Sequence, residues 1–202
     1  MKAAAVAAEK GHQVILCEKA GQLGGQVLLA QMLPERREFG VMVDNLKREM
    51  ELWSVEVRLN TYVDKAMVDI EKPDDIIIST GAEPFQSDAE ISKKTHVVEA
   101  WKVIQNNGVT GNSVVIADWR CDYIGMGLAE MLAKNGCDVR LAVDGTHAGQ
   151  NLQLYMRDNW IGRLDHLGVK VIPYARFFRA DGNTAYFYHT AGGRPILCEG
   201  MD

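Results

Sequence analysis

The pattern that most constrains the fold is a helix, a glycine and a short buried strand that ends in an acid. Residues 2–10 are alanine-rich helix formers, and Gly11 follows them where a helix commonly ends. Residues 13–17 are mostly apolar, as in a buried strand, and Glu18 comes next. This order is typical of the second half of a βαβ dinucleotide-binding unit, whose acid binds a ribose hydroxyl. The alternative is that Glu18 is merely a surface acid at a strand end.

A glycine-rich turn follows directly. Gly21, Gly24 and Gly25 lie close together, and glycine permits positive φ and a close approach of the backbone to a ligand. Further along the chain, the three isoleucines at 76–78 predict a buried parallel strand, and Gly81 predicts a turn after it.

Three segments carry a resemblance to a known family: Glu18-Lys19, Leu-Gly-Gly-Gln at 23–26, and Ile-Ile-Ile-Ser-Thr-Gly-Ala-Glu-Pro at 76–84. They look like the nucleotide-binding half of flavoproteins that have two dinucleotide-binding domains. The chain most resembles the C-terminal region of the iron–sulfur, Old Yellow Enzyme-type oxidoreductases. That group includes trimethylamine, dimethylamine and histamine dehydrogenases, N-methylproline demethylases and 2,4-dienoyl-CoA reductases. The resemblance covers essentially the whole chain and is strongest over residues 1–30, 74–84 and 112–145.

The resemblance implies roles for the matched residues. Glu18 would accept hydrogen bonds from the adenosine ribose of FAD or ADP, and its carboxylate would disfavour a 2′-phosphate. The backbone of Gly24 and Gly25 would pass close to the ribose or pyrophosphate, and Val63 would approach adenine. The full set of cofactor-binding candidates is Glu18, Lys19, Gly24, Gly25, Gln26, Val63, Thr80 and Gly81. We predict no catalytic and no metal-binding residue in this chain.

In that family a glycine-rich fingerprint precedes a helix similar to residues 1–5, so Met1 resembles an internal methionine of a longer protein. The resemblance implies an N-terminal barrel of the same polypeptide, carrying FMN, a 4Fe-4S cluster and the catalytic residues. On this interpretation the chain is the C-terminal nucleotide-binding part of an amine dehydrogenase or demethylase. We expect it to bind FAD or ADP weakly and to be inactive by itself, because the first strand and glycine turn would lie upstream.

The helix–glycine–strand pattern recurs. Residues 113–117 are predicted as a strand, 124–135 as a helix and 138–143 as a strand, with Gly136 placed as Gly11 is. After them, Asp-Gly-Asn at 181–183 between two apolar runs predicts a hairpin.

The sequence therefore predicts an α/β fold with two Rossmann-like, three-layer halves of the FAD/NAD(P)-binding type. The first domain, residues 1–84, would be of the FAD/ADP type and lack its initial strand and glycine turn. The second domain, residues 85–202, would be an NAD-type domain with a degenerate fingerprint.

The degenerate fingerprint begins at Asp118, where a pyrophosphate would need a glycine-rich turn. At about 4 Å and an effective dielectric near 20, one like-charge contact costs about 4 kcal/mol, or roughly a thousandfold in affinity. This departure resembles the amine-dehydrogenase and demethylase branch rather than the dienoyl-CoA reductases, which need NADPH there.

The composition limits the classes of binding partner that the chain can have. The chain has 22 Lys and Arg against 27 Asp and Glu, a net charge of −5, which predicts no nucleic-acid or membrane partner. The four scattered cysteines favour a reducing, cytoplasmic compartment over disulfides or zinc. Formation of a homo-oligomer remains open.

Two other functions remain open. One is a nucleotide-binding structural module without redox turnover, which the degenerate fingerprint favours. The other is an NAD(P)H-dependent flavoprotein of the 2,4-dienoyl-CoA reductase type. A pyridine nucleotide–disulfide reductase is disfavoured, because the sequence has no Cys-x-x-Cys.

Overall fold

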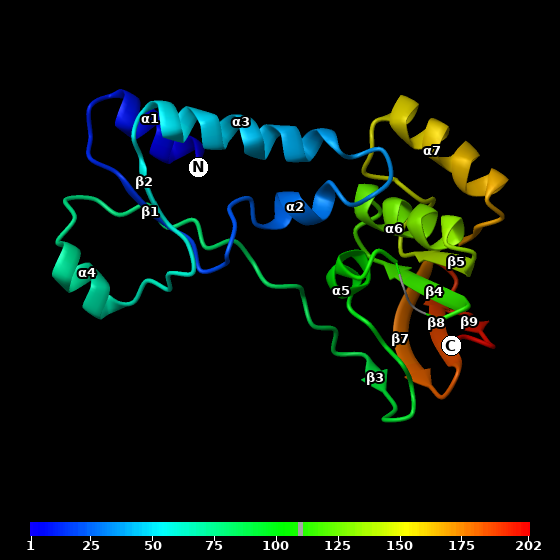
Figure 1. Cartoon of the computed structure of the whole chain (residues 1–202). Helices are drawn as coiled ribbons and strands as arrows, with labels where there is room; N and C mark the ends of the chain where they lie inside the picture. The colour runs from blue at the N-terminus through cyan, green and yellow to red at the C-terminus, as the bar shows by residue number, and fades with distance from the viewer. Residues whose placement is uncertain (109–110) are drawn as a thin grey trace. The chain divides into compact units, whose positions relative to one another are not determined.

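The computed structural model describes residues 1–108 and 111–202, which form two compact units. Unit 1 comprises residues 1–31 and 35–83, and unit 2 comprises residues 32–34 and 84–202. Figure 1 labels their helices and strands. The assignment of an FAD-type domain to residues 1–84 and an NAD-type domain to residues 85–202 stays a prediction.

Unit 1 combines helices with a short two-stranded parallel sheet. Its elements are α1 (Lys2–Glu9), β1 (Ile15–Cys17), α2 (Gln26–Ala30), α3 (Glu38–Leu52), β2 (Glu56–Arg58) and α4 (Lys65–Glu71). Strand β1 pairs in parallel with β2, with Ile15 opposite Glu56. Helices α1 and α3 lie against each other. Ala5 of α1, Met50 of α3 and Leu23, which precedes α2, form one cluster of buried residues.

The strand predicted at residues 76–78 is wrong. These residues adopt no regular structure, and Ile76, Ile77 and Ile78 are 56%, 71% and 80% exposed. A strand needs a neighbour for its N–H and C=O groups, and in the described part of unit 1 the ladder joins β1 and β2 to each other. An apolar run is therefore not sufficient to form a strand at this place.

Unit 2 contains two sheets. Its elements are β3 (Glu90–Ile91), α5 (Ala100–Gln105), β4 (Ser113–Asp118), α6 (Tyr123–Lys134), β5 (Asp138–Val143), α7 (Leu154–His166), β6 (Lys170–Ile172), β7 (Ala175–Asp181), β8 (Thr184–His189) and β9 (Pro195–Cys198). The order β4-β5-β6 is parallel throughout, and the second sheet has the order β3-β7-β8-β9. The predicted strand–helix–strand unit and the predicted hairpin are both confirmed.

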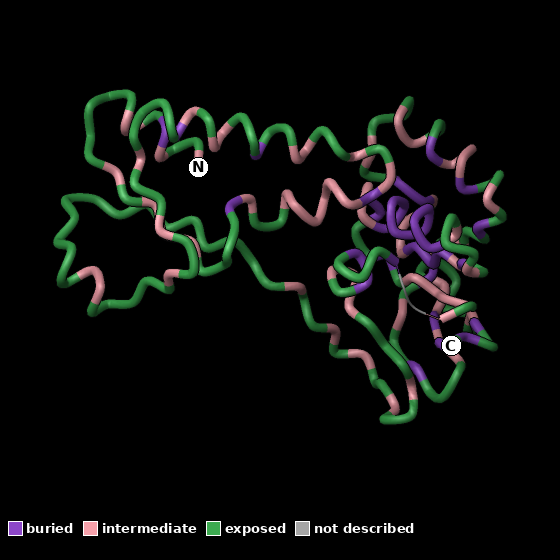
Figure 2. Tube along the Cα trace, in the orientation of Figure 1, coloured by how far each residue is buried: buried purple, intermediate pink, exposed green. Residues whose placement is uncertain are grey.

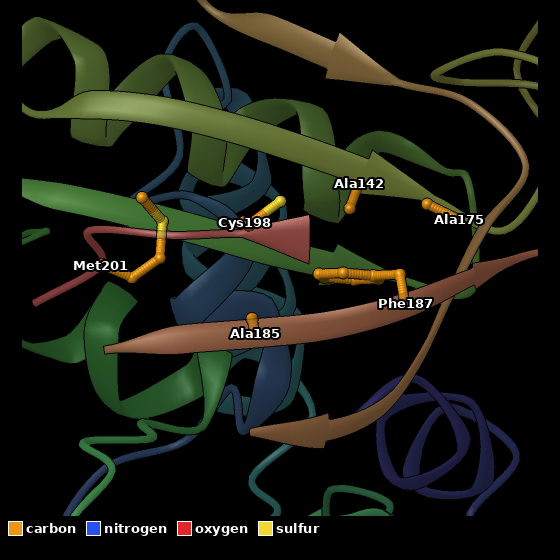
Figure 3. Close-up of a cluster of buried hydrophobic side chains, with 6 residues drawn as sticks. All are labelled: Ala142, Ala175, Ala185, Phe187, Cys198 and Met201. Atoms are coloured by element: carbon orange, nitrogen blue, oxygen red, sulfur yellow. The ribbon is translucent and has the colours of Figure 1, made fainter. Parts of the chain in front are cut away.

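The parallel sheet of unit 2 lies between the helices and the second sheet. Strand β5 contacts α6, which is buried along most of its length (Figure 2). Ala142 of β5 instead joins a core cluster with Phe187 and Cys198 of the second sheet (Figure 3). Successive strand residues face opposite sides, so β5 packs on both layers. The α/β class is confirmed, with three layers in unit 2.

A buried acid joins α6 to α7. Glu130 of α6 is fully buried, and its Oε2 accepts a hydrogen bond from Trp160 Nε1 of α7 at 2.7 Å. Arg163 Nη2 donates to the same oxygen at 3.2 Å, and Lys134 Nζ donates to Oε1 at 2.7 Å. The charge is therefore compensated where it is buried, as a buried carboxylate requires.

The two helix-ending glycines have matching geometry. Gly11 has φ +92° and Gly136 has φ +90°. In each case the glycine N–H bonds to the carbonyl three residues back, and the next residue bonds to the carbonyl five residues back. This is the Schellman motif, and it confirms that the sequence repeat is a structural repeat.

Candidate functional site

Glu18 lies half-buried at the carboxyl end of β1. Its N–H donates to the Arg58 carbonyl at 2.9 Å, which extends the β1–β2 ladder by one residue. Its Oε1 accepts the N–H of Ala20 at 2.8 Å. Within the hydrogen bonds described for the chain, Oε2 is not engaged, so the geometry leaves one carboxylate oxygen for a ligand hydroxyl.

The segment after β2 lies beside this strand end. The Thr61 N–H donates to the Glu18 carbonyl at 2.9 Å. The Lys19 ammonium lies 5.8 Å from the centroid of the Tyr62 ring, within cation–π range. Val63, the next residue, is 44% exposed. Glu18, Lys19 and the segment that contains Val63 therefore meet where two parallel strands end, the usual ligand edge of such a sheet.

Gly24 and Gly25 have different structural requirements. Gly24 has φ +124°, and a Cβ there would lie 2.8 Å from Leu28 Cγ. Gly25 has φ +52°, and a Cβ there would meet no atom within 4 Å. Packing within unit 1 thus explains the glycine at 24. The space around Gly25 remains open to a close-lying ligand.

Gln26 connects the glycine turn to the segment after the isoleucines. Its Nε2 donates to the Ala82 carbonyl at 3.2 Å, across 56 residues of sequence. Gly81 has φ +77°, and a Cβ there would lie 3.5 Å from Gln26 Nε2. Thr80 is exposed beside it. The structure therefore brings Gln26, Thr80 and Gly81 into one neighbourhood, and Glu18 and Lys19 into another at the β1–β2 edge.

In unit 2, Asp118 occupies the end of β4. Its Oδ1 accepts the N–H groups of Arg120 and Cys121, each at 3.0 Å. Its Oδ2 is buried and has no hydrogen-bond partner in the described residues. Burial raises the pKa of Asp118 to about 6, and the charge of Asp122 acts in the same direction, against the opposing effect of the two N–H donors.

Sequence reasoning missed Asp144. It follows β5 as Glu18 follows β1, and its N–H donates to the Asp118 carbonyl at 3.1 Å. Arg176 Nε of β7 donates to Asp144 Oδ2 at 3.0 Å. Extending the repeat past the second strand would have revealed this acid. In unit 2 the acid at the strand end is thus held by an arginine of the same unit.

Residues 1–108 and 111–202 contain no cluster of three or more His, Cys, Asp or Glu side chains arranged to hold a metal ion. Within the same residues no helix has the length and apolar character needed to cross a bilayer.

No protein-family model matches the chain. It is 34% identical over 155 residues to N,N-dimethylglycine/sarcosine dehydrogenase from Chromohalobacter salexigens, covering 74% of this chain and 22% of that protein. It is 37% identical over 139 residues to bilirubin reductase from Mediterraneibacter gnavus, covering 69% of this chain and 21% of that protein. The chain thus spans about a fifth of the length of these curated relatives, which are both named as oxidoreductases.

Among solved structures, histamine dehydrogenase from Rhizobium sp. 4-9 matches with a TM-score of 0.89 at 20% identity. The match covers 98% of this chain and 32% of that chain. At this identity the likeness establishes the fold, which is that of a region within a larger oxidoreductase chain.

Proposed function

The chain belongs to the Old Yellow Enzyme-type oxidoreductases related to amine dehydrogenases, whose C-terminal region it matches, and we propose that its unit 1 binds the adenosine part of FAD or ADP. The observation that carries this proposal is Glu18 at the carboxyl end of β1, with one carboxylate oxygen not engaged. In βαβ units an acid at this place binds the ribose hydroxyls and repels a 2′-phosphate.

The other candidates fit the same ligand. The open space beside Gly25 suits a backbone that approaches a ribose or pyrophosphate. Gln26, Thr80 and Gly81 would form the wall near the nucleotide, with Gln26 held by its bond to Ala82. Lys19 and Val63 would contribute at the adenine side.

We place the redox chemistry elsewhere in the complete polypeptide. The chain spans about a fifth of the length of its curated relatives. The proposed partner is an N-terminal barrel that holds FMN and a 4Fe-4S cluster, with dehydrogenation or demethylation of an amine as the proposed activity. In the cytoplasm this chain would then supply nucleotide binding and assembly rather than catalysis.

Calorimetry on the 202-residue protein tests the role of unit 1. We expect weak binding of ADP or FAD, with a dissociation constant on the order of millimolar, and weaker binding of NADPH. Glu18→Ala should weaken the binding about tenfold, because it removes charge-assisted bonds to the ribose. The matched control is Glu51→Ala, an exposed acid on α3 of the same unit.

The outcomes separate the alternatives. Equal ADP affinity in Glu18→Ala and wild type would contradict the proposed site. Absence of binding for ADP, FAD, NADH and NADPH would favour a structural module. Tight NADPH binding with turnover would favour a reductase of the dienoyl-CoA type. The similarity to bilirubin reductase does not by itself distinguish between these alternatives.

A further inference from the structure

The strand-to-helix turn of unit 2, residues 118–122, already has acceptors for its N–H groups. In a dinucleotide-binding βαβ unit, this turn presents its N–H groups to a pyrophosphate. Here Asp118 Oδ1 accepts from Arg120 and Cys121 at 3.0 Å each. Asp122 Oδ1 accepts from Ile124 at 2.9 Å. Two carboxylates of the chain therefore use the donors that a phosphate would need.

The Asp118 side chain also fills the space in front of α6. A Cβ built on Gly125 would collide with Asp118 Oδ2, so the carboxylate rests directly against the helix backbone. Asp118 is 6% exposed, and the absence of a described partner for Oδ2 leaves this charge only half satisfied. The carboxylate thus carries a negative charge, accepts two N–H groups of the turn and lies before α6, where a βαβ unit of this type binds phosphate.

The turn is held independently by the loop after β5. The Asn151 N–H donates to the Cys121 carbonyl at 3.0 Å, and Asn151 Nδ2 donates to the Arg120 carbonyl at 2.6 Å. The Asp144 N–H donates to the Asp118 carbonyl at 3.1 Å. These bonds involve the backbone rather than the Asp118 carboxylate. The turn should therefore keep its shape when the carboxylate is removed.

We propose that Asp118 is a specificity-determining residue, whose carboxylate occupies the position in unit 2 at which a phosphate group of a nucleotide would otherwise bind. It excludes phosphate groups by taking the turn's N–H donors and the space before α6, and not by charge repulsion alone. The inference rests on the proposed function only in treating unit 2 as a dinucleotide-type fold. It holds whichever nucleotide unit 1 binds.

Three variants of the full chain separate occupancy from charge. Asp118→Ala uncovers both N–H donors, whereas Asp118→Asn removes the charge but keeps an oxygen that accepts them. Asp138→Asn removes a half-exposed acid at the other end of the parallel sheet and serves as the matched control. Each protein is labelled with nitrogen-15 and titrated with inorganic pyrophosphate, and the amide signals of Arg120 and Cys121 are followed.

We expect Asp118→Ala to bind pyrophosphate at these amides about tenfold or more tightly than wild type. Asp118→Asn should gain less than Asp118→Ala, because it removes the charge but keeps an acceptor for the two N–H groups. Asp138→Asn should remain close to wild type. Equal gains in Asp118→Asn and Asp118→Ala would overturn the proposal in favour of simple charge repulsion. Unchanged affinity in folded Asp118→Ala would overturn it as well.

A measurement on the wild-type chain keeps the proposal testable even if Asp118→Ala does not fold. The Arg120 and Cys121 amides should be protected from hydrogen exchange, because both donate to Oδ1. Exchange of both at the rate of free amides would overturn the proposal. These signals report on unit 2, whereas Glu18→Ala reports on unit 1, so failure of either idea is distinguishable from failure of the other.

Discussion

Replacing Asp118 with asparagine should remove a pH dependence from the stability of unit 2. Burial raises the pKa of this carboxyl from 3.8 to about 6 in the folded chain. The folded state therefore binds more protons than the unfolded state between about pH 4 and pH 6. The contribution of Asp118 to stability is complete below the unfolded pKa and is lost as the pH rises through 6.

The size of the effect follows from the two pKa values. A difference of about 2 pKa units, at about 1.4 kcal/mol for each, corresponds to about 3 kcal/mol of unfolding free energy. Asp118→Asn does not titrate and keeps an acceptor for the Arg120 and Cys121 N–H groups. Relative to wild type, the variant should therefore gain about 2 kcal/mol between pH 4 and pH 7.5, because part of the total effect already occurs below pH 4.

Urea unfolding of both proteins at several pH values, followed by circular dichroism, measures this difference. Asp181→Asn is the control, since that half-exposed acid in the β7–β8 hairpin should show little change. Carbon-13 NMR of the Asp118 carboxyl gives the pKa directly. A free-energy difference that stays constant with pH, or a titration midpoint near 4, would refute the reasoning.

Three further predictions concern packing. Glu130→Gln should cost about 2 kcal/mol and shift the fluorescence of Trp160, because the amide keeps one acceptor oxygen and its NH2 group then faces either Lys134 or the Trp160 and Arg163 donors; an unchanged urea midpoint would contradict this. Gly24→Ala should destabilise unit 1 by about 2 kcal/mol more than Gly25→Ala, since both positions have positive φ but a Cβ at 24 also collides with a neighbour; thermal unfolding compares the two. Phe187→Ala should cost about 3 to 5 kcal/mol through the cavity it leaves between the sheets, and a loss below about 1 kcal/mol would show that the site collapses.

Much of the fold could be predicted from local patterns. The strand–helix–strand unit of β4, α6 and β5 and the β7–β8 hairpin occur where periodicity and turn residues place them. Gly11 and Gly136 end their helices with nearly the same φ. These features depend on residues that are near one another in sequence, so each segment carries its own signal.

For the candidate site, the sequence predicted which residues take part but not how they contact one another. The resemblance assigned Glu18, Gln26 and Gly81 to one ligand, and the structure adds the bond from Gln26 to Ala82 across 56 residues. Asp144 was not predicted, because an acid after a strand is common in sequences. Its role becomes visible only when β5 is recognised as the counterpart of β1 in the repeat.

By itself, the sequence determined the strand–helix–strand unit and the hairpin of unit 2, the helix-ending glycines and the acid at the end of β1. Tertiary structure decided that residues 76–78 form no strand, because a strand must pair its backbone N–H and C=O groups with a neighbouring strand, and apolar side chains do not provide that neighbour. It also decided that the Asp118 carboxylate bonds to the N–H groups of its own turn instead of only facing a ligand. Local propensity acts within a few residues, whereas pairing, burial and charge compensation depend on groups that meet only when the chain has folded.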